Sequence, residues 1–178
     1  MELAARLGSP WVVATPPREE CDPAQISQRY RDLLELGRQA GVRPTMEYIS
    51  FFGSVSRLSQ AWRIAQEAND PGATIIIDSF HTWNSGGDIE ELREIPAERI
   101  SHFHIDDADP GMPAGTQADP NRVMPGDGPI DLEAEIAILR TIGYEGTVSL
   151  ELFNPELWEK DPAEVLCTGI ERMRELFA

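Results

Sequence analysis

Four polar residues lie at or near the ends of successive apolar runs in this 178-residue sequence: Glu47, Asp78, His104 and Glu151. Carboxylates and imidazoles are the groups with which proteins hold divalent metals and move protons. A carboxylate buried by itself costs on the order of several kcal/mol, and three brought together would repel one another without a cation between them. The set therefore predicts a divalent metal site. Because it contains no thiolate, we expect Mn2+ first, with Mg2+, Co2+ or Zn2+ as alternatives.

The alternation of side chains along a strand predicts that these residues share one face. Glu47 points away from its apolar neighbours Met46 and Tyr48. In the other runs Asp78 shares a face with Ile76, His104 with His102, and Glu151 with Ser149. Taken singly, each acid could instead cap a following helix or turn, since the loops after strands often carry Asp or Glu.

Three further residues lie where a substrate could reach them: His81, Trp83 and Arg122. His81 comes three residues after Asp78, and an ordinary pKa of about 6.5 suits a catalytic acid or base as well as a substrate contact. Arg122 belongs to the loop 106–129, whose length is typical of lids and substrate clamps. Alternatively, His81 is a loop histidine that bonds to the backbone, and Arg122 forms a surface salt bridge.

Other polar and aromatic residues have simpler explanations. Asp106 and Asp107 follow His104 and either hold its imidazole in one tautomer or are loop acids. His102 lies one layer deeper than His104 and is expected to pack in the interior. Packing is also expected of Trp11, Trp62 and Trp158.

The elements that must position these residues alternate along the chain. Apolar runs rich in Val, Ile, Phe and Tyr predict strands at 11–15, 45–49, 74–78, 100–105 and 147–152. Segments with helical spacing lie between and after them, at 23–41, 55–69, 131–143 and 161–176. This order predicts an α/β fold with a parallel sheet. No glycine-rich phosphate loop follows any strand, so the polar strand ends favour a (β/α)8 TIM-barrel type over a doubly wound nucleotide-binding sheet.

The length sets a limit on this barrel. A (β/α)8 barrel usually takes about 250 residues and eight strands, whereas five strands are predicted here and residues 1–10 read as the end of a helix that leads into a strand. We therefore expect residues 1–178 to be one domain, the C-terminal portion of a barrel, with about five of eight βα units. Its uncovered sheet edges would favour self-association into a homo-oligomer.

Composition excludes several classes of partner. The net charge of −16 is spread along the chain, and nucleic acid binding needs clustered Lys and Arg. No run approaches the ~20 apolar residues of a membrane span, and no signal peptide is recognisable. A cytoplasmic protein that acts on a small molecule is expected.

The segments "MEYI", "IIIDSFHTW", "ISHFHIDDAD", "RVMPGDGPIDL" and "GYEGTVSLELFNPELWEKDP" together resemble the xylose-isomerase-like TIM-barrel family of sugar isomerases and epimerases, and within it the members that isomerise inosose (2-keto-myo-inositol) in inositol catabolism. The resemblance implies that Glu47, Asp78, His104 and Glu151 hold the metal. It also implies that the two glutamates move a proton and that His81 and Arg122 contact the substrate.

The implied activity is a metal-dependent isomerisation or epimerisation of a keto-polyol or sugar of the inosose type, through an enediolate. Related barrels dehydrate 3-dehydroshikimate or epimerise ketoses, and the same four ligands would serve them. A truncated relic or interaction module without catalysis is the alternative from another class. It is disfavoured because all four ligands are retained.

Overall fold

The computed structural model describes residues 1–178. Its helices are α1 (Glu2–Arg6), α2 (Pro23–Ala40), α3 (Leu58–Glu67), α4 (Ser79–Asn84), α5 (Leu132–Thr141), α6 (Pro155–Trp158) and α7 (Pro162–Leu176). Its strands are β1 (Trp11–Ala14), β2 (Arg43–Met46), β3 (Thr74–Asp78), β4 (Ile100–Ile105), β5 (Asp107–Ala108), β6 (Arg122–Val123) and β7 (Thr147–Leu150). Short 3-10 turns lie at Ile89–Glu94, Ala97–Arg99 and Asp119–Asn121.

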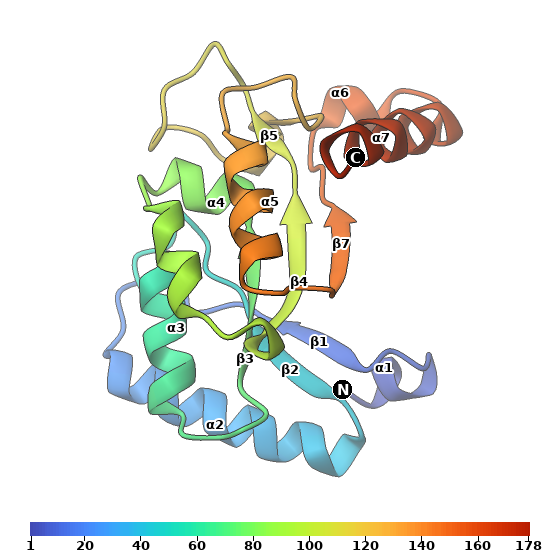
Figure 1. Ribbon diagram of the computed structural model, residues 1–178. Helices are drawn as coiled ribbons and strands as arrows, with labels where there is room; N and C mark the ends of the chain where they lie inside the picture. The colour runs from blue at the N-terminus through green and yellow to red at the C-terminus, as the bar shows by residue number, and fades with distance from the viewer.

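Five of the strands form one parallel sheet in the order β1-β2-β3-β4-β7. The sheet curls as part of a closed barrel does, and β1 and β7 form its two edges (Figure 1). β5 and β6 make a separate antiparallel ribbon beyond the end of β4. The predicted barrel-type α/β fold is confirmed, with five strands that overlap the predicted ones; β2 begins two residues earlier than predicted, at Arg43.

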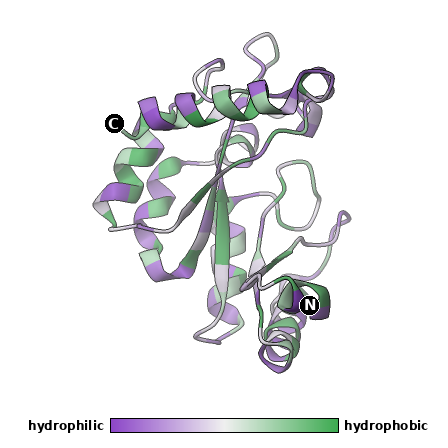
Figure 2. Ribbon diagram, turned by 90° about the vertical axis from the view of Figure 1, so that its right-hand side faces the viewer, coloured by the Kyte–Doolittle hydropathy of each residue, from purple (hydrophilic) through white to green (hydrophobic).

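One face of the sheet packs against helices and forms the hydrophobic core. Met46, Ile75, Ile77, Phe103 and Ile105 belong to this core, together with apolar residues of α2, α3 and α5. Both strands and helices carry hydrophobic and hydrophilic positions, and the central strand in this view has a long hydrophobic stretch (Figure 2). The residues between these core positions point to the other face, so the predicted alternation holds in β2, β3 and β4.

Local sequence signals fix α2 against this sheet. The Asp22 side chain accepts a hydrogen bond from Ala24 N at the start of the helix, and Gly41 ends it with φ +73°. The hydroxyl of buried Tyr30 donates to Thr74 O over 2.6 Å and accepts from Thr74 N over 3.0 Å. One tyrosine therefore ties the helix to β3.

Three features differ from the sequence prediction. The strands predicted at 45–49 and 147–152 end at Met46 and Leu150, so Glu47 and Glu151 lie one residue beyond β2 and β7. The helix α4 and the β5–β6 ribbon were not predicted, because elements of six and two residues are too short to show periodicity. Trp158, expected to pack, is 64% exposed.

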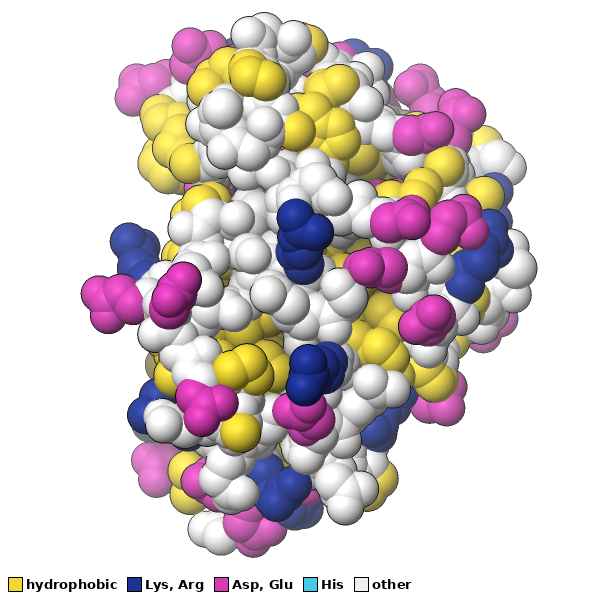
Figure 3. Space-filling view, turned by 90° about the vertical axis from the view of Figure 1, so that its left-hand side faces the viewer, with side chains coloured by type: hydrophobic (Ala, Val, Ile, Leu, Met, Phe, Trp, Pro, Cys, Tyr) yellow, Lys and Arg dark blue, Asp and Glu magenta, His cyan; other side chains and the backbone are white.

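The surface shows no concentration of one charge on the face that carries α2 and α3. Acidic and basic side chains are interspersed there, with apolar patches between them (Figure 3). None of the helices combines the length and the hydropathy that a membrane span requires.

Glu135 of α5 is an anomaly of the core. It is fully buried, and neither carboxyl oxygen has a hydrogen-bond partner in the chain. Burial is the main reason why the pKa of Glu135 rises from its ordinary value to about 8, and the charges of Asp78 and Asp106 raise it further. The side chain is therefore neutral at pH 7.

This burial predicts a pH dependence of stability. The folded-state pKa lies above the unfolded value, so the contribution of Glu135 is fully present below pH ~4.5 and is lost as pH rises through about 8. Glu135→Gln stays neutral, and we expect its free energy of unfolding to exceed that of the wild type at pH 9 by on the order of a few kcal/mol. Urea unfolding at pH 5, 7 and 9 measures the difference. Exposed Glu133→Gln on the same helix is the control, and a gap that is equal at pH 5 and pH 9 would disprove the assignment.

Candidate metal centre

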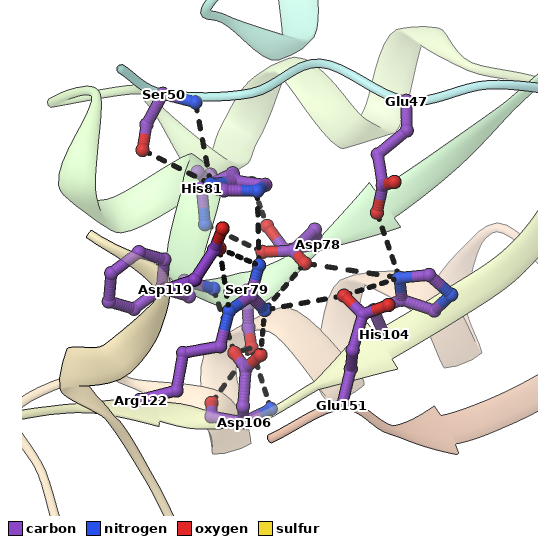
Figure 4. Close-up of polar contacts among 12 residues, drawn as sticks. Glu47, Ser50, Asp78, Ser79, His81, His104, Asp106, Asp119, Arg122 and Glu151 are labelled. Carbon is purple, nitrogen blue, oxygen red and sulfur yellow. Dashed lines mark hydrogen bonds and ion pairs between the residues drawn. The ribbon is translucent and has the colours of Figure 1, made fainter. Parts of the chain in front are cut away.

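The four predicted strand-end residues meet at one place. Asp78 and His104 are register partners on β3 and β4, while Glu47 and Glu151 follow β2 and β7. One ligand atom from each of the four lies within 4.8 Å of all the others. Figure 4 shows Glu47, Asp78 and Glu151 directed at the imidazole of His104.

The carboxylates converge on a single ring nitrogen. His104 Nδ1 lies 2.9 Å from Glu47 Oε1, 3.2 Å from Glu151 Oε2 and 3.9 Å from Asp78 Oδ2. Glu47, Asp78 and His104 are buried, whereas the Glu151 side chain is 27% exposed. Glu151 is therefore the ligand that solvent or a substrate reaches most easily.

The local charges set the protonation states of the group. Burial raises the pKa of Glu47. Burial alone would lower the pKa of His104, but hydrogen bonds to Glu151 and Glu47 outweigh it and raise the pKa to about 10. Burial alone would raise the pKa of Asp78, but the charge of Arg122 outweighs it and lowers the pKa to about 2.

Asp78 performs two tasks with its two oxygens. Oδ1 accepts a hydrogen bond from His81 N over 2.6 Å and caps α4, while Oδ2 accepts from Arg122 Nη1 over 2.8 Å and faces His104. The helix-cap alternative is thus confirmed for one oxygen. The other oxygen remains directed at the cluster.

Arg122 is buried beside the cluster, with only 1% of its surface exposed. Nη1 donates to Asp78 and Asp106, and Nη2 donates to Asp119 over 3.2 Å and contacts His81 Nε2 at 3.0 Å. Nε lies 3.4 Å from Asp119 Oδ1. A guanidinium has five N–H groups, and all five have acceptors within the chain. Arg122 is not the surface salt bridge that the sequence left open.

His81 is held on both sides of its ring. Nε2 faces Arg122, and Nδ1 lies 3.1 Å from the hydroxyl of Ser50. The pKa of His81 is lowered, chiefly by burial. Ser50, which the sequence did not single out, is only partly buried and follows Glu47 by three residues.

Trp83 and two loop acids lie outside the cluster of four. Trp83 packs against the hydrophobic core and does not join the cluster. Asp106 accepts from Ser79 Oγ and Phe80 N and pairs with Arg122, and so does not contact His104. Asp107 accepts the backbone amides of Gly126, Gly128 and Ile130. Of the two alternatives that the sequence left open, support of the imidazole is not seen: Asp106 holds Arg122, and Asp107 holds the following turn.

The middle of the long loop 106–129 is hydrogen-bonded to α4. Asn84 Oδ1 accepts from Gly115 N over 2.8 Å, and Asn84 Nδ2 donates to Gln117 O over 2.9 Å. The buried Gln117 side chain donates to the carbonyls of Asp109 and Met112. These bonds order the loop beside α4.

The donor set fits a divalent cation. Three carboxylates and one imidazole suit Mn2+, Mg2+, Co2+ or Zn2+. Bonds of about 2.1 Å place opposite ligands at most about 4.2 Å apart, which is close to the observed spread of the four atoms. A cation there would also offset the repulsion between the carboxylates. The four residues form a candidate divalent-metal site.

Comparison with known proteins agrees with this geometry. A family model described as "Xylose isomerase-like TIM barrel" matches residues 1–176. The inosose isomerase of Bacillus subtilis (strain 168) is 32% identical over 177 residues, which are 95% of this chain and 63% of that enzyme. A 3-dehydroshikimate dehydratase of Pseudomonas putida is 33% identical over 127 residues, 69% of this chain and 20% of that enzyme. A crystal structure of the IolI protein with a bound zinc atom matches with a TM-score of 0.92 and 30% identity, covering 98% of this chain and 65% of that one.

The raised pKa of His104 predicts that metal binding releases a proton. At pH 7 the imidazole is protonated, since its pKa is about 10, and Nδ1 binds a metal only after losing that proton. Calorimetric titration with Mn2+ in buffers of different ionisation enthalpy should give roughly one proton released, and affinity should increase with pH up to about 10. In His104→Gln the buffer dependence should shrink. A heat that is the same in every buffer for the wild type would contradict the prediction.

Proposed function

Because the chain belongs to the xylose isomerase-like TIM barrel family, we propose that it acts as a divalent-metal-dependent isomerase of an inosose-type keto-polyol. The observation that carries this proposal is the placement of two glutamates around one candidate metal site, each within 3.2 Å of His104 Nδ1. The inosose isomerase of B. subtilis, of which the chain spans 63%, supports the same substrate class.

In this proposal Glu47, Asp78, His104 and Glu151 hold the metal, with Mn2+ preferred. A bound divalent cation polarises a ketone and the hydroxyl beside it, which makes the intervening C–H group more acidic. The protein contributes the fixed positions of the four ligands on neighbouring strand ends. It also contributes the burial that keeps water away from three of them.

Glu47 and Glu151 are the proposed proton-transfer pair. One carboxylate removes the proton from the hydroxyl-bearing carbon next to the ketone, which leaves an enediolate. A proton returned to the former carbonyl carbon, with the hydroxyl proton moved from the former alcohol oxygen to the former carbonyl oxygen, completes the exchange of ketone and alcohol between the two carbons, with no change of formula. The raised pKa of Glu47 brings its basicity nearer to neutral pH, where a general base works best.

His81 and Arg122 form the other side of the proposed site. Arg122 would hold Asp78 and His81 in place, and His81 would orient the groups that contact the substrate. Since the pKa of His81 is lowered, chiefly by burial, the ring is neutral near pH 7. Trp83 stays a proposed substrate contact; its side chain is partly buried and packs against the hydrophobic core.

The charge balance favours an uncharged substrate over the dehydratase alternative. Arg122 is paired with Asp78, Asp106 and Asp119, so its charge is already neutralised and its N–H groups are occupied. The carboxylate of 3-dehydroshikimate would meet Glu47 and Glu151 without a free cation from this chain. A neutral polyol carries no such penalty.

Glu151→Gln tests the proton-transfer role. We expect inosose isomerisation with Mn2+ to fall at least ~100-fold, because an amide cannot carry the proton while its oxygen can still contact the metal. Exposed Glu156→Gln on α6 should retain activity. Full turnover in Glu151→Gln with metal bound would contradict the role. Wild-type protein that dehydrates 3-dehydroshikimate faster than it isomerises inosose would favour the dehydratase.

A further inference from the structure

The buried polar groups beside the candidate metal site form one continuous chain of hydrogen bonds. It runs from Asp78 through Arg122 and His81 to Ser50 and ends at Asn84, with links of 2.8, 3.0, 3.1 and 2.8 Å. Figure 4 shows His81 between Arg122 and Ser50. Each hydrogen bond needs one donor and one acceptor. Once the donor of the first bond is known, the donors of the following bonds are fixed as well.

Arg122 fixes the direction. A guanidinium can only donate, so the Nη2–H group donates to His81 Nε2, which must carry a lone pair. The proton of the neutral ring then lies on Nδ1 and is donated to Ser50 Oγ. The Ser50 amide lies 3.4 Å from the same nitrogen and would favour the other tautomer. The shorter contact to the charged guanidinium at 3.0 Å outweighs it, since charge-assisted bonds are about twice as strong.

Ser50 is thereby left with a free proton. Its oxygen accepts from Asn84 Nδ2 over 2.8 Å and from His81 Nδ1 over 3.1 Å, which uses both lone pairs of a hydroxyl. With the proton on His81 Nδ1, no acceptor in the chain is left for the Ser50 hydroxyl hydrogen. Arg122 and His81, by contrast, have no free N–H group. Among these residues only Ser50 has a hydrogen-bond donor to spare.

Ser50 also lies where a ligand can reach it. It is partly exposed, three residues beyond Glu47, and next to Phe51, which is 42% exposed and has its ring 5.6 Å from that of His81. The free hydroxyl therefore lies beside His81, in the same loop as the exposed Phe51 ring and three residues after the candidate ligand Glu47. An uncharged polyhydroxy ring suits these surroundings, because its oxygens accept hydrogen bonds and its C–H groups pack against aromatic faces.

We infer that Ser50 is a substrate-contacting and specificity-determining residue, whose hydroxyl donates to an oxygen of the keto-polyol and is aimed by the relay of Arg122 and His81. The inference rests on the proposed function for the identity of the ligand. The hydrogen-bond relay from Arg122 through His81 to Ser50 does not depend on the proposed function. A donor with no partner in the chain would disfavour ligands that lack an oxygen at that place.

The first test measures the relay in the free protein. Long-range ¹⁵N–¹H correlation spectra of the histidine rings report which nitrogen carries the proton. We expect the Nδ1–H tautomer for His81, and an Nε2–H tautomer would overturn the inference whatever the protein binds. In Arg122→Gln the preference should weaken, because an amide can also accept.

The second test measures ligand binding. Calorimetric titration of the Mn2+-loaded protein with 2-keto-myo-inositol should show affinity at least ~10-fold weaker in Ser50→Ala, equivalent to about 1.4 kcal/mol. Mn2+ affinity should stay unchanged. Ser50→Thr, which keeps the hydroxyl, should bind within about threefold of the wild type, and Ser56→Ala in the same loop is the matched control.

The outcomes separate the inference from the proposed function. Ser50→Ala that binds the ketone as tightly as the wild type overturns the contact, and Ser50→Ala that loses Mn2+ shows a structural role instead. Wild-type protein that binds Mn2+ but not the ketone defeats the proposed function and the substrate contact with it. Even then, the tautomer of His81 would show whether the hydrogen bonds from Arg122 through His81 to Ser50 run in the inferred direction.

Discussion

Repulsion between buried carboxylates is the constraint on which this structure depends. Glu47, Asp78 and Glu151 meet at His104, and Asp106 lies on the far side of Arg122. Such a group persists only if cations are held within it or some of its carboxyls are protonated, and burial raises the pKa of both Glu47 and Asp106. Arg122 is one such cation, and a protonated His104 or a divalent metal is the other.

Much of the surrounding structure serves to hold Arg122 in place. The β5–β6 ribbon begins immediately after Asp106 and presents Arg122 from the opposite strand. Asp107 gathers the amides of the following turn, and a side chain at Gly128 would collide with Asp107 and Ala108 O. Two adjacent acids thus have separate tasks: Asp106 pairs with the Arg122 guanidinium, and Asp107 accepts the backbone amides of the turn that follows Arg122.

The sequence predicted the parts of the site that follow from strand periodicity. A period of two residues fixes which side chains share a face, so Glu47, Asp78, His104 and Glu151 could be grouped without coordinates. The partners of Arg122 could not be predicted in this way, because the 18 residues that separate Arg122 from His104 carry no periodic signal. Ser50 lies in a loop, where nothing distinguishes it from other serines. Glu135 occupies an apolar helix position, but an acid there is usually read as a surface residue. The direction in which the Trp83 side chain points is set by the short helix α4, and α4 could not be predicted from the sequence.

The most direct test of the central claim, that four strand ends form one metal site, is a calorimetric titration of the metal-stripped 178-residue chain with Mn2+ beside an Asp78→Ala variant. We expect one ion per chain for the wild type and loss of that binding in the variant, since Asp78 both ligates and anchors Arg122. Equal binding by both proteins, or no binding by the wild type, would contradict the claim.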